Sequence, residues 1–408
     1  MSMKVVITGI GGISAAGANL AETLEAFRNG RRNAGPVSLF PTTLPYPVFE
    51  ARAGSIPPRW ERKGMRTLSL ALSALEEALA DAGLRVEEDL SPLRVGICLG
   101  TTVASQLNDI EFYRSYRDRG SAPMDAVDRY LKGNLAQAIS STLKVRGPAL
   151  TVVNACSSGT DAIGAALSWL RSGICDVAIA GGADELNRVP LCGFGALGIV
   201  SETLCRPFDR DRGGLNLGEG AGILILETES VARRRGVAPA LFMAGYGSAC
   251  DAYHLTAPRP DGTGLEAALA RALAEAGAAP SDVSFINAHG TATQDNDRIE
   301  GRVLAGVFGP DVKFLSTKGF TGHTLGAAGG LEAVFTAAAL REGWIPACAG
   351  FVHPDEEIGV RPVTEITSVR GPLAVSTSLA FGGNNAALVI ARAEDGGTWR
   401  SRSCTLRE

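Results

Sequence analysis

The chain has no closely spaced cysteine pairs and no long apolar run, and each absence removes a class of protein. Its eight cysteines form no CxxC pair in 408 residues, so the sequence predicts neither a zinc cage nor a disulfide framework. The longest uncharged stretch near the start, residues 5–20, is interrupted by glycines and is shorter than the roughly 20 apolar residues that span a bilayer. It also lacks the basic leader and cleavage site of a signal peptide. We therefore expect a cytoplasmic protein that binds no membrane and holds no metal.

An excess of basic residues is also absent. With 39 Lys and Arg against 43 Asp and Glu, the net charge is −4, and nothing in the composition indicates binding to DNA or RNA. A chain that is 45% hydrophobic and 20% charged is typical of an ordinary folded protein. Its length allows a large core and fits two fused subdomains better than one small domain.

Short β-rich runs alternate with alanine-rich helical stretches, which indicates an α/β protein with largely buried strands. The predicted strands are residues 5–8, 95–99, 151–154, 177–180, 222–226, 285–288, 314–316, 374–377 and 387–391. The predicted helices include residues 66–82, 159–172, 264–276, 295–308 and 325–341. In each half, a strand delivers a reactive residue to a turn and a Gly/Ala-rich helix follows. This pattern suggests an internal duplication, which we divide into residues 1–245 and 246–408.

One cysteine stands in a context typical of a nucleophile. Cys156 follows the apolar segment Val152-Val153 and precedes Ser157-Ser158-Gly159, small residues at the start of a predicted helix. The exposed N–H groups at a helix start carry partial positive charge, which favours the reactive thiolate. The spacing therefore predicts that Cys156 lies at a strand-to-helix turn and takes part in acyl transfer.

Two of the only four histidines, His289 and His323, lie in turns rich in glycine and threonine. Two neutral imidazoles that face one pocket can donate hydrogen bonds from Nε2 to a thioester carbonyl as an enolate forms, without a metal. We interpret His289 and His323 as this pair. His353 is expected to be a surface or structural residue, and the role of His254 stays open.

The remaining parts of such a site also have candidates. The backbone N–H groups of Cys156 and of the glycine-rich turn Phe381–Asn385 are candidate donors to the oxyanion. Lys318 ends a predicted buried strand, and Glu332 follows a run of glycine and alanine that is too small for a solvated face. We therefore predict a buried Lys318–Glu332 pair that orients the histidine.

Nearly the whole chain resembles the β-ketoacyl-[acyl-carrier-protein] synthases of the type I/II elongating class, the condensing enzymes of fatty-acid and polyketide synthesis. The segments that carry the resemblance are residues 6–9, 154–159, 206–209, 218–222, 251–254, 287–291, 318–323 and 381–383. Their order and spacing together are highly specific. The resemblance implies a thiolase-like fold, in which two duplicated βαβαβαββ halves form a five-layered α-β-α-β-α sandwich.

The same resemblance implies roles for individual residues. Cys156 accepts the acyl group, and His289 and His323 promote decarboxylation and condensation with support from Lys318 and Glu332. Phe381 matches the family's gating phenylalanine beside the nucleophile. The substrate-binding residues are Thr291 and Thr293, expected on the carrier's pantetheine arm, and Gly382 and Gly383.

The implied reaction is the decarboxylative condensation of an acyl thioester with malonyl-acyl-carrier-protein, giving β-ketoacyl-acyl-carrier-protein in fatty-acid elongation. The substrates arrive on the carrier's phosphopantetheine, and no cofactor is expected. Acyl carrier proteins are acidic, so a local basic patch can recruit them. The residues that resemble the family's docking positions are Arg59, Arg62, Lys63, Arg66 and Arg206. The family is usually homodimeric, and a heterodimer with a related subunit stays open.

Departures from the elongation pattern leave alternatives. Leu379-Ala380 precede Phe381 where these enzymes usually carry Phe-Gly, and Asn384 stands where threonine is usual. Residues 294–297 and 318–324 look more like ketosynthases of aryl-polyene or related polyketide pathways, which is the main alternative. A non-catalytic partner such as a chain-length factor is less expected, because those relatives usually lose the cysteine that Cys156 matches.

Overall fold

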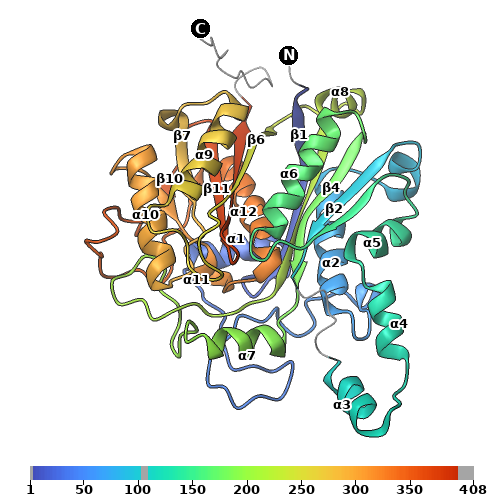
Figure 1. The fold of residues 1–408 in the computed structure, drawn as a ribbon. Helices are drawn as coiled ribbons and strands as arrows, with labels where there is room; N and C mark the ends of the chain where they lie inside the picture. The colour runs from blue at the N-terminus through green and yellow to red at the C-terminus, as the bar shows by residue number, and fades with distance from the viewer. Residues whose placement is uncertain (1–2, 103–108, 394–408) are drawn as a thin grey trace.

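The computed structural model describes residues 3–102 and 109–393, and their main sheet has ten strands (Figure 1). The strands of the first half are β1 (Val5–Ser14), β2 (Val95–Gly100), β3 (Ala149–Val152), β4 (Val177–Asp184) and β5 (Gly220–Thr228). Those of the second half are β6 (Leu241–Cys250), β7 (Val283–Asn287), β8 (Phe314–Leu315), β11 (Leu373–Ala380) and β12 (Asn384–Arg392). A separate ribbon pairs β9 (Trp344–Ile345) with β10 (Thr367–Ser368).

The two halves repeat one topology. From the outer edge inward the first half runs β3-β2-β4-β5-β1, and the second runs β8-β7-β11-β12-β6, so corresponding strands hold corresponding places. The pairs β2·β3, β2·β4, β7·β8 and β7·β11 are parallel, and the other pairs within each half are antiparallel. The halves meet where β1 pairs with β6, with Val6 opposite Phe242. The division at residue 245/246 falls inside β6, which the strand order assigns to the second half.

The helices form three layers around the sheet. The central layer holds α6 (Ser158–Arg171) and α12 (Ala328–Glu342), which contact each other and strands of both halves. Helices α2 (Arg66–Asp81) and α5 (Leu135–Leu143) pack on the first half, and α9 (Thr263–Ala276) with α10 (Gln294–Phe308) on the second (Figure 1). The predicted five-layered fold is therefore confirmed. The other helices are α1 (Leu20–Arg28), α3 (Ile110–Arg119), α4 (Asp125–Lys132), α7 (Arg188–Ala196), α8 (Glu229–Arg234) and α11 (Lys318–Thr321).

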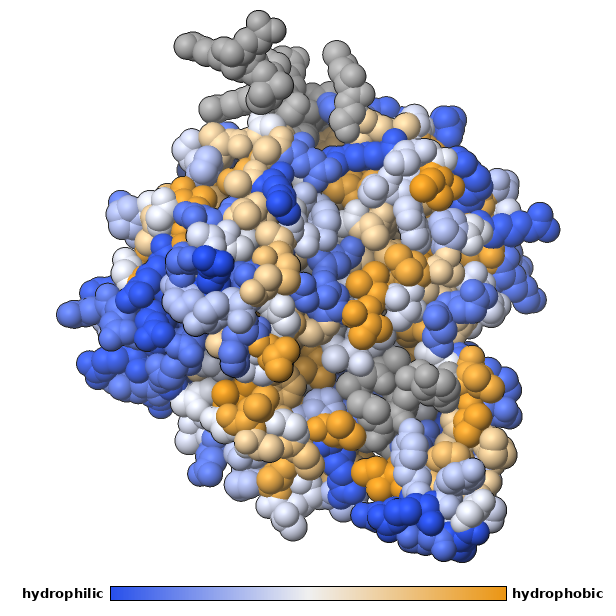
Figure 2. Space-filling view, viewed as in Figure 1, coloured by the Kyte–Doolittle hydropathy of each residue, from blue (hydrophilic) through white to orange (hydrophobic). Residues whose placement is uncertain are grey.

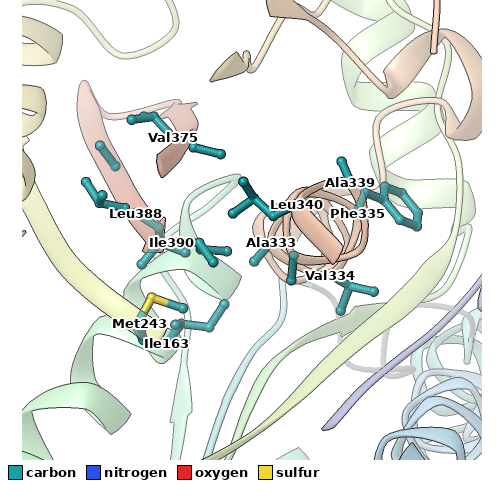
Figure 3. Close-up of a cluster of buried hydrophobic side chains, with 14 of the residues drawn as sticks. Ile163, Met243, Ala333, Val334, Phe335, Ala339, Leu340, Val375, Leu388 and Ile390 are labelled. Carbon is teal, nitrogen blue, oxygen red and sulfur yellow. The ribbon is translucent and has the colours of Figure 1, made fainter. Parts of the chain in front are cut away.

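Helix α12 is the centre of the core. All its residues from Ala328 to Leu340 are buried, as expected for a helix that is apolar on every side. Figure 3 shows Val334, Phe335 and Leu340 projecting from α12, with the side chains of the neighbouring strands beside the helix. Glycines let α6 and α12 meet at their N-terminal ends, because a Cβ on Gly159 would lie 2.6 Å from the backbone nitrogen of Gly330. This contact brings together the turns that precede the two helices.

The predicted strands and helices are present, with ends shifted by a few residues, but the short β9 and β10 and the ten-residue β6 were not predicted. Its glycines interrupt the β pattern, and the structure gives their reason. A Cβ on Gly245 would lie 2.2 Å from the carbonyl oxygen of Ala272 in α9. At the corresponding place in the first half, a Cβ on Gly9 in β1 would lie 2.1 Å from the carbonyl oxygen of Ala78 in α2. Close helix packing therefore replaces the bulky side chains expected of a strand.

Within residues 3–102 and 109–393, no helix combines the length and apolar character needed to cross a membrane.

Candidate active site

Cys156 lies at the tip of a tight turn between β3 and α6. The preceding Ala155 has a φ of 48°, in the left-handed region that residues other than glycine seldom adopt. Ser158 holds this turn closed, because its hydroxyl donates to the carbonyl of Ala155 at 2.6 Å and accepts from the N–H of Asn154 at 2.7 Å. The predicted strand–turn–helix arrangement around Cys156 is therefore present.

The thiol of Cys156 is buried and protonated at neutral pH. Burial raises its pKa to about 11, although the Lys318 charge and the backbone N–H of Phe381 lower it. Burial therefore opposes the thiolate that the helix start is expected to favour. The His323 Nε2 atom lies 3.0 Å from Sγ, which places an imidazole where it can accept the thiol proton.

Lys318 connects His289 to Glu332. Its ammonium donates to the His289 carbonyl at 2.6 Å and to Glu332 Oε1, and it lies 3.1 Å from His289 Nδ1. An ammonium has three donors and no acceptor, so His289 Nδ1 must accept and its proton must sit on Nε2. The predicted buried Lys318–Glu332 pair is present, and the histidine that it orients is His289.

Both histidines are neutral at physiological pH. Burial and the Lys318 charge hold the pKa of His289 and of His323 well below the usual value. The two rings lie 5.2 Å apart at an interplanar angle of 87°. His289 therefore offers an N–H from Nε2, as the sequence predicted for a donor to a developing enolate.

Two buried carboxylates behind His289 were missed at the sequence level. Glu300 of α10 accepts from the backbone N–H groups of His289 and Gly290, both at 2.8 Å. Asp297, one turn earlier, accepts from the backbone N–H of Ala292 at 3.1 Å. Their spacing on a helix that begins just after the His289 segment was the available signal, but helical acids are usually solvated. They fix the backbone of this turn.

A cavity of about 310 Å³ lies over the reactive groups, and Cys156, His289 and His323 all line it. Its apolar walls include Phe194, Leu197, Ile199, Leu215, Leu379 and Phe381. Phe381 stacks on Phe194 with ring centroids 5.3 Å apart. The cavity is therefore suited to an apolar chain that ends at the thiol.

The predicted substrate-binding residues separate into two groups. Thr291 and Thr293 line the cavity, and their hydroxyl oxygens lie 2.8 Å apart. Gly382 and Gly383 do not line it, and their N–H groups donate to the carbonyls of Leu255 and Ala380. Both glycines have positive φ, so they shape the turn beside Phe381 and have no free N–H for a ligand.

The predicted docking cations also differ in their surroundings. Arg66 is paired with the buried carboxylate of Glu219, and Arg59 with Glu76. Among the described residues, no acidic side chain forms an ion pair with Lys63, with Arg62 or with Arg206. These three, and above all the exposed Lys63, are the cations available to a partner.

The other two histidines lie apart from the thiol. His353 Nδ1 lies 2.8 Å from Asp211 at the surface, in line with the surface role expected for it. His254 Nδ1 accepts from the backbone N–H groups of Thr256 and Ala257, both at 3.1 Å, so it fixes the loop that borders the cavity.

A duplicated thiolase-like fold with a cysteine and two histidines in one cavity defines an acyl-transfer enzyme. The family model of the β-ketoacyl synthase N-terminal domain matches residues 2–232, and that of the C-terminal domain matches residues 241–352. The chain therefore belongs to the β-ketoacyl synthase family.

Individual relatives agree with this assignment. The chain is 34% identical to 3-oxoacyl-[acyl-carrier-protein] synthase 2 of Staphylococcus aureus (strain MRSA252), over 96% of this chain and 99% of that protein. It superposes on the ishigamide ketosynthase/chain length factor with a TM-score of 0.90 at 32% identity, covering 97% and 100% of the two chains. A chain of the complex between the ketosynthase ApeO and its chain length factor ApeC from Xenorhabdus doucetiae gives a TM-score of 0.82 at 29% identity, covering 96% of this chain and 98% of that chain.

Proposed function

We propose that this chain catalyses the decarboxylative condensation of an acyl thioester with malonyl-acyl-carrier-protein to give β-ketoacyl-acyl-carrier-protein and CO2. The observation that carries the proposal is the convergence of Cys156, His289 and His323 in one largely apolar cavity, with Lys318 orienting His289. The match to a 3-oxoacyl-[acyl-carrier-protein] synthase over nearly the full length supports it. We expect no cofactor, because the substrates carry their own activating thioester.

In the first half-reaction, Sγ of Cys156 attacks the carbonyl of the acyl-carrier thioester. The thiol proton passes by way of His323 Nε2 to the departing carrier thiolate, so the products are an acyl-enzyme and a free carrier thiol. The N–H groups of Cys156 and Phe381 are the candidate donors to the oxyanion, and the Phe381 N–H is close enough to Sγ to lower the pKa of the thiol.

In the second half-reaction, malonyl-carrier loses CO2 and leaves an enolate on its thioester. Hydrogen bonds from His289 Nε2, and from His323 when its proton is on Nε2, stabilise the enolate oxygen. The enolate carbon then attacks the acyl-enzyme carbonyl, a C–C bond forms and Cys156 leaves as thiolate. Neutral histidines suit this task because they donate without being consumed as acids.

Separating the two half-reactions tests the proposal. We expect Cys156→Ala to form no acyl-enzyme, and Cys156→Gln to retain decarboxylation of malonyl-carrier, because the histidines remain in place. The measurements are protein mass after incubation with acyl-carrier, and conversion of malonyl-carrier to acetyl-carrier. Condensation that survives in Cys156→Ala would contradict the proposal.

A ketosynthase of a specialised polyketide pathway is the second candidate. The TM-score of 0.90 to the ishigamide ketosynthase/chain length factor favours it, as do the departures at Leu379, which lines the cavity, and at Asn384, which precedes the lining residue Asn385. The two candidates differ in the acyl group that loads Cys156: saturated chains support fatty-acid elongation, and polyenoic or aryl-polyene chains support the specialised pathway. A non-catalytic chain-length-factor role is less favoured, because such a subunit needs no thiol and histidines in contact.

For the carrier partner, we infer docking at Arg62, Lys63 and Arg206. Attraction of an acidic carrier to exposed cations weakens with added salt. Lys63→Glu should therefore raise the KM for acyl-carrier at low salt and leave the KM for a small acyl thioester without carrier unchanged. Equal effects on both substrates would argue against docking at this position.

We infer that the outer edge of β3 is the dimer contact. This strand has no neighbour on one side among the described strands; Leu150 within it is 42% exposed, and Val153 directly after it is 67% exposed. Figure 2 shows hydrophobic side chains over nearby α4, where Leu131 is 71% exposed. Light scattering of the wild-type protein should give twice the mass of one chain. The Val153→Asp variant should give the mass of a single chain. A wild-type monomer would favour a related partner subunit over a homodimer.

A further inference from the structure

A chain of side-chain hydrogen bonds joins the turn that holds Cys156 to the turn that holds Phe381. Asn384 Nδ2 donates to Asn154 Oδ1 at 2.7 Å, and Asn154 Nδ2 donates to Asp161 Oδ2 at 2.5 Å. Asn154 lies two residues before the nucleophile. Asn384 pairs with Ala380 across the base of the second turn.

Asp161 anchors this chain to both halves of the molecule. On its own helix, α6, its Oδ2 also accepts from the hydroxyl of Ser157 at 2.8 Å, the residue next to Cys156. From the second half, the hydroxyl of Tyr246 in β6 donates to Oδ1 at 2.8 Å. Burial and the Asp161 charge raise the pKa of Tyr246, so this phenol stays protonated and remains a donor.

The charge of Asp161 fixes the direction of every bond in the chain. An ionised carboxylate only accepts, so Asn154 must present its amide NH2 to Asp161 and its oxygen to Asn384. Asn384 must then act as the donor. A side chain of the same shape that only accepts, such as aspartate, cannot replace it while Asp161 stays charged.

We propose that Asn154, Asp161 and Asn384 are positioning residues that hold the Phe381 turn against Cys156 during acyl loading. The inference rests on the proposed function, because it concerns the acylation half-reaction. Phe381 and Cys156 line the same cavity, the backbone N–H of Phe381 lowers the pKa of the thiol, and Asn384 closes the turn that holds Phe381 there. Loosening Asn384 therefore affects the loading of Cys156, whereas the His289–Lys318–Glu332 group, which has separate contacts, keeps its geometry.

Variants at Asn384 separate donor ability from shape. Loss of one hydrogen bond to a charged group in this half-buried network corresponds to about a tenfold change in rate. We expect Asn384→Asp to slow acyl loading of Cys156 by about tenfold, although aspartate has the shape of asparagine. Asn384→Thr, which keeps a donor, should lose less. Decarboxylation of malonyl-carrier should stay near the wild-type rate in both, and the exposed Asn29→Asp is the control for the added charge.

A double variant that reverses the direction of these hydrogen bonds should restore acyl loading. In Asp161→Asn/Asn384→Asp the carboxylate sits at the other end, so Asn154 can turn over and donate to residue 384 while it accepts from residue 161. The Ser157 hydroxyl, which loses its carboxylate acceptor, keeps the carbonyl of Asn154 at 3.0 Å. The double variant should load Cys156 faster than Asn384→Asp alone, as measured by rapid-quench intact mass. Loading by Asn384→Asp at the wild-type rate, or no rescue, would overturn the inference. A wild-type protein that accepts no acyl group would instead overturn the proposed function.

Discussion

Replacing Lys318 by methionine tests how the site prepares His289. Lys318 donates to the His289 carbonyl and to Glu332, and it leaves His289 Nδ1 as an acceptor. Methionine keeps an unbranched side chain but removes all three donors and the charge. The proton of His289 is then free to sit on either ring nitrogen, and nothing holds Nε2–H toward the cavity.

The expected loss differs between the half-reactions. Removing one oxyanion donor costs about 10²- to 10³-fold in kcat in other enzymes, and the variant keeps an imidazole, so we expect about a 10²-fold fall in malonyl-carrier decarboxylation. Acyl loading should slow less, by about tenfold, because the Lys318 charge lowers the pKa of the Cys156 thiol and its loss raises that pKa further.

Stability should change little in this variant. Burial raises the pKa of Glu332 to about 7 even beside Lys318. Near neutral pH, this shift already lowers the free energy of unfolding of the wild-type protein by about 3 kcal/mol. Without Lys318 the carboxyl stays protonated, and the added cost through this group is under about 1 kcal/mol. Thermal unfolding of the Lys318→Met variant measures this change in stability. In the kinetic assays, a fall in decarboxylation no larger than the fall in acyl loading would refute the role given to Lys318.

The remaining predictions concern charge and stability. The raised pKa of Glu332 means that the folded state binds its proton more tightly than the unfolded state does, so this group makes wild-type stability fall as pH rises from about 4.5 to about 7. Glu332→Gln should remove about 3 kcal/mol of that fall, as measured by urea unfolding at several pH values. Parallel curves of stability against pH for the variant and the wild type would contradict the burial argument. Arg66→Ala leaves Glu219 buried without its partner and should cost about 3 kcal/mol or more, whereas Lys63→Ala should leave the free energy of unfolding unchanged. Equal free energies of unfolding for these two variants would contradict the structural role of Arg66 and favour the docking role that the sequence predicted for it.

The repeated architecture and the central site residues could be predicted from the sequence because their signals are local. A strand followed by small residues and a helix indicates the turn at Cys156, and buried strands read as short apolar runs. The strand β6 has the opposite character. Its glycines serve the approach of α9, a contact between elements that no local pattern reveals.

The pairing of side chains across the two halves was the least predictable part of the site. Lys318 was expected beside a histidine, but its contact with His289 rather than His323 depends on how the turns fold over each other. Likewise, Arg66 lies in a basic segment that is typical of a docking surface, yet a buried acid 153 residues away, Glu219, pairs with it. Long-range partners decide which charges are free.

Loading of Cys156 tests the central claim most directly. The purified protein would be incubated with a panel of acyl-carrier thioesters, saturated and polyenoic, followed by malonyl-carrier, with intact mass recorded at each step. We expect a mass gain on Cys156 that malonyl-carrier discharges as β-ketoacyl-carrier, and the best-loaded acyl group identifies the pathway. No mass gain with any acyl group, with the protein folded, would contradict the assignment of this chain as a condensing enzyme.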